Sequence, residues 1–199
     1  MFGRSALTLG TAEPHVKTSE RQRPGGPGAG TFRPVRSLLL RQIGAPFEVG
    51  DLPEPTAAPD EVLVDIAFAS VNPLDIWVSQ GNIGSAAQHL PWVPGTEATG
   101  WSSGNAVLVR GNGIGVFRPG LTRERAVVPA STLLPLPDGL DLALAAALGT
   151  AGTTAWNAVH TKAQVRPGDR VVVLGASGGV GTVACQLARA AGAEVWGQS

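Results

Sequence analysis

The sequence predicts an α/β plus β fold class: a β-rich domain of short strands, followed by the first strand–helix–strand unit of a parallel α/β domain that is itself incomplete. Three observations support this. Residues 171–174 form an uninterrupted apolar run, typical of a parallel strand buried on both faces. A glycine-rich turn follows at once, and beyond it apolar residues recur at helical spacing. Residues 37–135, by contrast, read as short strands separated by turns.

The composition indicates a folded protein with a neutral surface. Hydrophobic residues make up 43% of the 199 residues and charged residues 15%, which is enough apolar material to bury a core. Fifteen basic and 15 acidic residues cancel, so we expect no nucleic-acid partner and no attraction to an anionic membrane. The apolar runs fall short of the roughly 18 residues that a membrane span needs.

The single cysteine, Cys185, excludes an intramolecular disulfide. This usage fits a reducing compartment, and we expect a cytoplasmic protein.

Residues 1–36 are predicted to be a disordered tail. Residues 23–30 are rich in proline and glycine, and no apolar periodicity is sustained in this region. A secretory signal would need an apolar core of about 7 residues or more, and Ala6–Leu9 is too short. A transit peptide is an alternative, while an over-long gene start is the preferred explanation.

The region after the tail is predicted to contain short strands and one short helix. Apolar and polar residues alternate over residues 62–69, which indicates a strand with one more heavily buried face. Asn72 is suited to cap a helix and Pro73 to its first position, so a helix through Ser79 is expected. Residues 91–95 are predicted to form a turn. Further strands are expected over residues 37–42, 47–50, 107–109 and 126–128.

The glycine-rich turn favours binding of a pyrophosphate at a helix N-terminus. Ala176, Gly178 and Gly181 occupy the three glycine positions of a G-x-G-x-x-G pattern. A side chain at Gly178 would block close approach of the backbone to a phosphate, and Gly181 lies where helix and strand pack closely. Ser177 adds a hydroxyl, and an ordinary glycine turn is the alternative. The expected packing stripe of the helix is Val180, Val183, Ala184, Leu187, Ala188 and Ala191, and a second strand begins at Glu194.

Three stretches together resemble one protein family. Residues 163–197 resemble the entry to the cofactor domain of medium-chain dehydrogenases/reductases, specifically of the zinc-free quinone oxidoreductase (zeta-crystallin-like) branch. Asn72–Asp75 reads N-P-L-D and Pro94–Gly100 reads P-G-T-E-A-T-G, both similar to elements of that branch. The resemblance covers Val35–Ser199. It implies a GroES-like domain over residues 37–135 and the start of a Rossmann domain over residues 136–199, and we interpret the chain as truncated at the C-terminus.

The resemblance also implies a function, namely hydride transfer from NADPH to a quinone or an activated enone or aldehyde. Asn72 would be the catalytic residue, as a polar contact near the reacting centre. The cofactor-binding residues would be Thr154, Ser177, Gly178, Gly179, Val180, Gly181 and Ser199. A homodimer is one open expectation. The alternative is a truncated, non-catalytic product that binds a nucleotide weakly or acts as an interaction module, and the chain as given is expected to show little turnover.

No metal site is expected. In zinc-dependent relatives, cysteine or histidine would stand at the positions of Asn72, Thr96 and Thr150, and the residues here do not form the ligand set that zinc prefers. NADPH is expected in preference to NADH, because the end of the second strand, Gly197–Ser199, lacks the carboxylate that accepts from a ribose hydroxyl. Glu194 stands at the beginning of that strand, too far back to do so.

Four polar residues have two interpretations each. Asn72 is expected both to cap its helix and to lie near a nicotinamide. Asp75 is treated first as a structural residue at a helix N-terminus. Glu97 is equally suited to a buried hydrogen bond and to catalysis. His160 is interpreted as a partner of a helix C-terminus rather than as a base.

Overall fold

The computed structural model describes residues 34–199. The tail predicted for residues 1–36 therefore lies outside the described residues as far as residue 33. The two explanations offered for this tail concern the same part of the chain. The first strand, β1 (Val35–Leu39), begins two residues before the predicted domain start at residue 37. It pairs antiparallel with β2 (Glu48–Leu52), and Val35 lies opposite Leu52.

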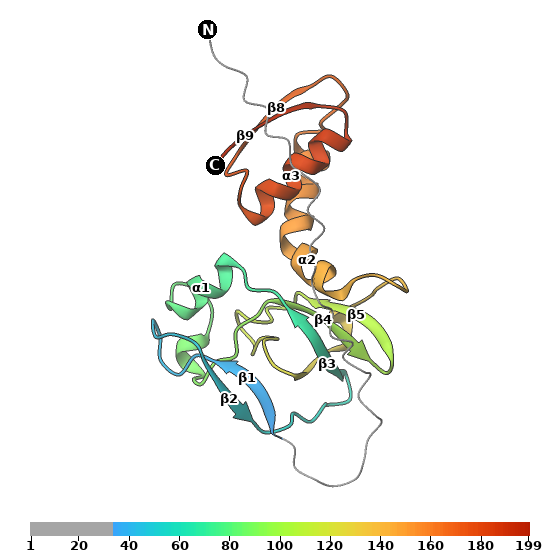
Figure 1. The fold of residues 1–199 in the computed structure, drawn as a ribbon. Coiled ribbons are helices and arrows are strands. Elements are labelled where there is room, and N and C mark those ends of the chain that lie inside the picture. Colours follow the sequence, from blue (N-terminus) through green and yellow to red (C-terminus); the bar gives the residue numbers. More distant parts are fainter. Residues whose placement is uncertain (1–33) are drawn as a thin grey trace. The chain divides into compact units, whose positions relative to one another are not determined.

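The β-rich part is built on a five-stranded antiparallel sheet with the order β6-β3-β4-β5-β7 (Figure 1). Its core consists of apolar side chains that these strands and their connections share, among them Val64, Ala98, Val109 and Leu121, each fully buried. The strand bounds are β3 (Glu61–Ala69), β4 (Glu97–Ser102), β5 (Asn105–Arg110), β6 (Arg125–Pro129) and β7 (Leu133–Pro135). Short 3-10 turns lie at Ala86–Gln88 and Ala130–Thr132.

The strands β1 and β3 each differ from the prediction. The strand expected over residues 37–42 ends at Leu39, because Leu40 pairs instead with Trp92 and the carbonyl of Gln42 accepts from the N–H of Ala45 in a turn. In β3 the expected alternation holds through fully buried Val64. It fails at Phe68, which is 46% exposed, since the register with β4 shifts between Ile66 and Phe68.

The hairpin between β4 and β5 turns through only two residues. Ser103 and Gly104 both have positive φ angles, 49° and 82°, as a two-residue hairpin turn requires. The strands pair without interruption from Glu97–Arg110 to Ser102–Asn105. The two residues between β4 and β5 are therefore enough to form a complete hairpin.

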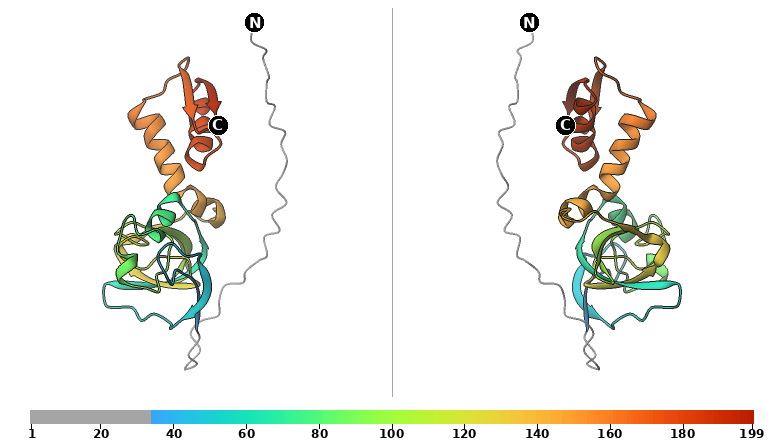
Figure 2. Two further views of the ribbon diagram at one scale, coloured as in Figure 1. Left: turned by 90° about the vertical axis from the view of Figure 1, so that its left-hand side faces the viewer. Right: turned by 90° about the vertical axis from the view of Figure 1, so that its right-hand side faces the viewer.

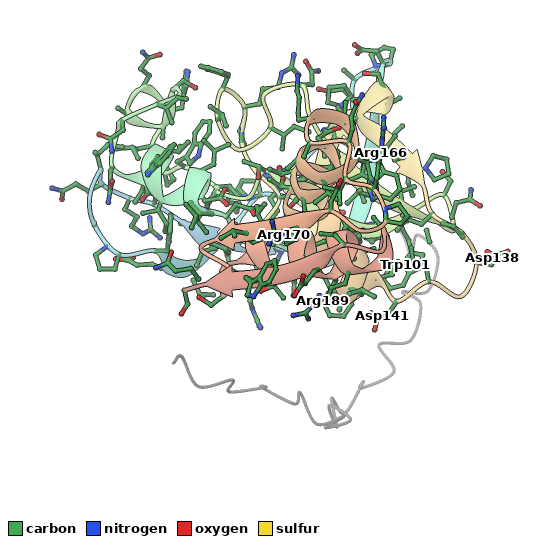
Figure 3. The ribbon with its side chains drawn as sticks, turned by 90° about the horizontal axis from the view of Figure 1, so that it is seen from above. Trp101, Asp138, Asp141, Arg166, Arg170 and Arg189 are labelled. Carbon is green, nitrogen blue, oxygen red and sulfur yellow. The ribbon has the colours of Figure 1, made fainter. Side chains whose placement is uncertain are left out.

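Two helices follow the sheet. The first, α2 (Leu142–Trp156), is capped by Asp141, labelled in Figure 3, whose carboxylate accepts from the N–H groups of Ala143 (2.8 Å) and Leu144 (3.3 Å). It continues into a π-helical segment, Asn157–Lys162. His160 lies in the last turn of this segment, near the helix end as the sequence predicts, and its ring contacts that of Trp156 in a tilted arrangement, with the centroids 4.1 Å apart.

The predicted strand–helix–strand unit is present. The parallel strands β8 (Arg170–Leu174) and β9 (Glu194–Gln198) are joined by α3 (Gly179–Ala190), and the unit runs from orange at β8 to dark red at β9 in Figure 2. Ala184 and Ala188 are buried, and Val183 and Leu187 pack beside them as expected. Val180 departs from the predicted stripe, since it is 38% exposed at the first turn of α3.

Burial of β8 differs between its two faces. Val171 and Val173 pack in the cluster that includes Ala155, Ala184 and Ala188. Their neighbours Val172 and Leu174 are 65% and 75% exposed. Although an apolar run of this kind is typical of a strand buried on both faces, helices cover only one face of β8 within the described residues.

Candidate functional site

The helix that carries Asn72 begins as the sequence predicts. It is α1 (Pro73–Ser79), with Asn72 as N-cap residue and proline in the first turn. Oδ2 of Asp75 accepts from the backbone N–H of Asn72 (2.7 Å), and Oδ1 accepts from the backbone N–H of Gly95 (2.9 Å). This carboxylate, only 1% exposed, therefore ties the start of α1 to the loop before β4. These contacts agree with the structural role expected for Asp75.

The surroundings of Asp75 raise the pKa of its carboxyl above the ordinary value. Burial is the largest cause, and the nearby carboxylate of Glu97 adds to it. The hydrogen bonds from Asn72 and Gly95 act in the opposite direction, because they stabilise the ionised form. Asp75 thus holds the start of α1 against the loop before β4, although burial disfavours the ionised form of its carboxyl.

We expect Asp75→Asn to lower the free energy of unfolding by about 1–3 kcal/mol, since a carboxamide offers one acceptor oxygen to two N–H groups. The folded pKa is raised, so the contribution of Asp75 is fully present below its ordinary pKa of 3.8 and is lost as pH rises through the folded pKa. The difference between wild type and variant should therefore shrink from acid to neutral pH. Urea unfolding at a series of pH values measures it, and a difference that grows with pH would contradict this account.

Glu97, the first residue of β4, is the centre of a buried hydrogen-bond network. Its side chain is 1% exposed. Oε1 accepts from Ser70 Oγ (2.7 Å) and from Asn72 Nδ2 (3.1 Å), while Oε2 accepts from Thr150 Oγ1 (2.8 Å) on α2. Asn72 Nδ2 also donates to Ser70 Oγ (3.2 Å). Of the two interpretations of Glu97, the contacts favour the buried hydrogen bond.

The network depends on a glycine in the neighbouring helix. A Cβ added to Gly149 would meet Oε2 of Glu97 and lie 2.7 Å from its Cδ, so only glycine lets α2 approach this carboxylate. Arg110 Nη1 holds the same turn of α2 by donating to the carbonyl of Gly149 (3.2 Å) and to Thr153 Oγ1 (3.2 Å).

A pocket of about 680 Å³ brings Asn72 together with the glycine-rich turn. Thr150 and Ala151 of α2 line it with Asn72, and the wall is otherwise mostly apolar. Of the residues predicted to bind a cofactor, the pocket includes Gly178, Gly179, Val180 and Gly181. Thr154, Ser177 and Ser199 are exposed and do not line it.

The start of α3 has the geometry of a phosphate site. Thr182 is the first residue whose N–H reaches a helical acceptor, the carbonyl of Gly178 (2.9 Å). The three preceding amides, of Gly179, Val180 and Gly181, are left free by the helix and carry its positive end. A Cβ on Gly178 would find only Gly175 O within 4 Å, at 3.3 Å, so its absence leaves open space. The turn therefore fits the pyrophosphate of a dinucleotide.

Gly181 has the packing role that the sequence predicts. A Cβ there would meet the carbonyl of Gly175 and lie 2.8 Å from Ala176 Cα. The hydroxyl of Thr182 closes the same turn by donating to the carbonyl of Ala176 (3.1 Å).

Sequence reasoning misses two members of the site. Nothing in the sequence singles out Ser70, and Thr150 stands out only as a position where relatives carry a metal ligand. The hydrogen bonds of the network join residues that are up to 53 positions apart in the chain. No local sequence pattern marks these residues. Over residues 34–199, no group of three or more His, Cys, Asp or Glu side chains could hold a metal ion. Within the same range, no helix is long and apolar enough to cross a membrane.

Comparison with known proteins identifies a matching domain family and similar oxidoreductases. Residues 58–102 match the alcohol dehydrogenase GroES-like domain, which confirms the predicted GroES-like fold. The chain is 34% identical over 172 residues to a quinone oxidoreductase of Rattus norvegicus, covering 82% of this chain and 52% of the relative. It is 35% identical over 175 residues to a probable acrylyl-CoA reductase of Escherichia coli, covering 81% and 54%. The chain thus spans about half the length of the curated relatives it matches.

Two solved structures resemble the chain. A quinone oxidoreductase from Thermus thermophilus, also solved as a complex with NADPH, gives a TM-score of 0.67 at 36% identity, over 81% of this chain and 52% of that one. A cobalt- and zinc-bound alcohol dehydrogenase from Pyrobaculum aerophilum gives 0.73 at 29% identity, over 84% and 60%.

Proposed function

Because the chain belongs to the medium-chain dehydrogenase/reductase family of oxidoreductases, we propose that it transfers hydride from NADPH to a quinone or to an activated enone or aldehyde. The observation that carries the proposal is the pocket in which Asn72 and the glycine-rich turn share one wall. A pocket lined mainly by apolar groups with a few convergent polar ones is typical of a small-molecule site.

The residues divide into those for the cofactor and those for the substrate. The free amides of Gly179, Val180 and Gly181 hold the pyrophosphate, with Ser177 beside them. Thr154 and Ser199 lie outside this pocket. Their proposed roles, contact with the nicotinamide side and donation to the 2′-phosphate, rest on the family resemblance. NADPH supplies the hydride, and the chain supplies binding, orientation and exclusion of water. Asn72 is the polar side chain next to the reacting centre.

Two further features belong to the same proposal. The reaction needs no zinc, since Asn72 and Thr150 offer neither thiolate nor imidazole and both are hydrogen-bonded to Glu97. The GroES-like domain extends over residues 37–135 and the Rossmann domain begins at residue 136.

The test is a titration of the full-length gene product with NADPH and NADH, followed by NADPH oxidation with a benzoquinone and with an enone. We expect tighter binding of NADPH, because no carboxylate stands at Gly197–Ser199 to repel a 2′-phosphate. Ser199→Glu should weaken NADPH binding at least tenfold and keep or tighten NADH binding, because a carboxylate there can accept from the ribose 2′-hydroxyl. Ser199→Ala is the matched control, with a smaller loss. Tighter NADH binding by the wild type would overturn the NADPH assignment.

A second candidate is an interaction module that binds a nucleotide without turnover, and the exposed apolar face of β8–β9 favours its interaction part. Val172, Leu174 and Trp196 are 65%, 75% and 44% exposed there, and such a face invites association. Binding of NADPH with no oxidation against either substrate would select this candidate.

A further inference from the structure

The amide nitrogen of Asn72 faces a buried carboxylate. A carboxylate has no proton to donate, so the atom that faces Glu97 Oε1 at 3.1 Å must be Nδ2. The same Nδ2 also donates to Ser70 Oγ at 3.2 Å. Ser70 Oγ and Glu97 Oε1 lie only 2.7 Å apart, so the amide nitrogen of Asn72 faces this pair. Oδ1 is what remains of this amide for the pocket.

Thr150 is restricted in the same way. A hydroxyl carries one donor, and that of Thr150 goes to Glu97 Oε2 at 2.8 Å. The hydroxyl of Ser70 likewise donates to Oε1 at 2.7 Å. One buried carboxylate thus takes donors from three side chains, and both of its oxygens are occupied. Asn72 and Thr150 both line the pocket, and the donor atoms of both are directed at Glu97.

We propose that Glu97 is a positioning residue that makes the Asn72–Thr150 wall accept hydrogen bonds and not donate them. The wall then recognises a donor group on its ligand. Two groups in the proposed reaction have this chemistry, the carboxamide N–H of the nicotinamide and the hydroxyl of a reduced substrate. The carbonyl oxygen of a quinone or enone has no proton to offer, so Asn72 does not polarise it. This inference rests on the proposed function.

The substitution Glu97→Gln tests the polarity of the wall. The carboxamide that it introduces would present an N–H₂ group toward either Thr150 or the Ser70–Asn72 pair, and the residue that meets this group must turn its own donor elsewhere. The wall then gains a donor toward the pocket. Glu48→Gln is the matched control, because Glu48 is an exposed carboxylate on β2 that pairs with Arg41 and does not line the pocket.

Binding is measured on the full-length gene product with two ligand pairs, each differing by one donor. The first pair is NADPH and its reduced 3-acetylpyridine analogue, which lacks the carboxamide N–H. The second is a hydroquinone and its methyl ether. For the pair whose donor meets the wall, the wild type and Glu48→Gln should prefer the donor ligand by about 3- to 10-fold, as a neutral hydrogen bond supports. In Glu97→Gln this preference should fall below about twofold. Equal affinities within both pairs in the wild type would overturn the proposal.

A second measurement needs neither ligand nor a folded Glu97 variant. In the wild type, the side-chain N–H protons of Asn72 should exchange slowly with solvent in a nitrogen-15 NMR experiment, because the amide nitrogen donates to the buried carboxylate of Glu97. Those of Asn82, which donates on the exposed surface to Gln80, should exchange fast. Fast exchange at Asn72 would overturn the inference. If the Asn72 protons exchange slowly but the protein does not bind NADPH, the proposed function is contradicted while the inference about the Asn72–Thr150 wall is supported.

Discussion

Gly149→Ala should lower the free energy of unfolding by about 3 kcal/mol, although alanine is intrinsically the better helix former by about 1 kcal/mol. The added Cβ would meet Oε2 of Glu97, whose carboxylate is buried and held by three hydrogen bonds. Displacing it leaves the donors of Ser70, Asn72 and Thr150 without a partner in a buried site, which is the costly half of a hydrogen bond.

Gly152→Ala is the control in the same helix. Its Cβ would meet only the side chain of Leu148, at 3.2 Å from Cβ, one turn earlier on α2. It should therefore be neutral or stabilise the chain by up to about 1 kcal/mol. Urea unfolding measures the free energy of unfolding of both variants, and the two values can be compared if the slope of this free energy against urea concentration is unchanged. Equal stability of Gly149→Ala and Gly152→Ala would show that the approach of α2 to Glu97 is not tight.

Gly181→Ala should disrupt both the fold of the strand–helix–strand unit and the binding of a dinucleotide. The added Cβ would collide with backbone, meeting the carbonyl of Gly175 and lying 2.8 Å from Ala176 Cα, so no side-chain rotation can relieve it. We expect a loss of about 2–4 kcal/mol in stability. Amide hydrogen exchange in β8 and α3 should rise accordingly.

Gly179→Ala separates binding from folding. The nearest atom to its Cβ would be Ala151 Cβ at 3.8 Å, an ordinary contact, and the position lies at the start of α3. Stability should be kept or slightly raised. Under the proposed function, however, the methyl group occupies space beside the pyrophosphate, and the affinity for NADPH should fall about tenfold or more. Unchanged NADPH affinity in this variant would remove the glycine-rich turn from the binding site.

Local features of the sequence were enough for α1 and for the strand–helix–strand unit. Asn72 and Pro73 determine where α1 begins, because cap and first-turn preferences depend on backbone geometry within a few residues. The packing role of Gly181 could likewise be predicted, since strand, turn and helix are contiguous. Strand ends were less certain, as at Leu40, whose pairing partner Trp92 lies far along the chain.

The tertiary structure alone decided what the polar residues do. A glutamate after a turn suits catalysis and burial equally, and only the convergence of Ser70, Asn72 and Thr150 on Glu97 distinguishes the two. Sequence also could not separate Thr150 from Thr154, one helical turn apart, of which the first lines the pocket and the second does not. Spacing within one element predicts its backbone, whereas the partners of a buried carboxylate come from elements brought together by packing.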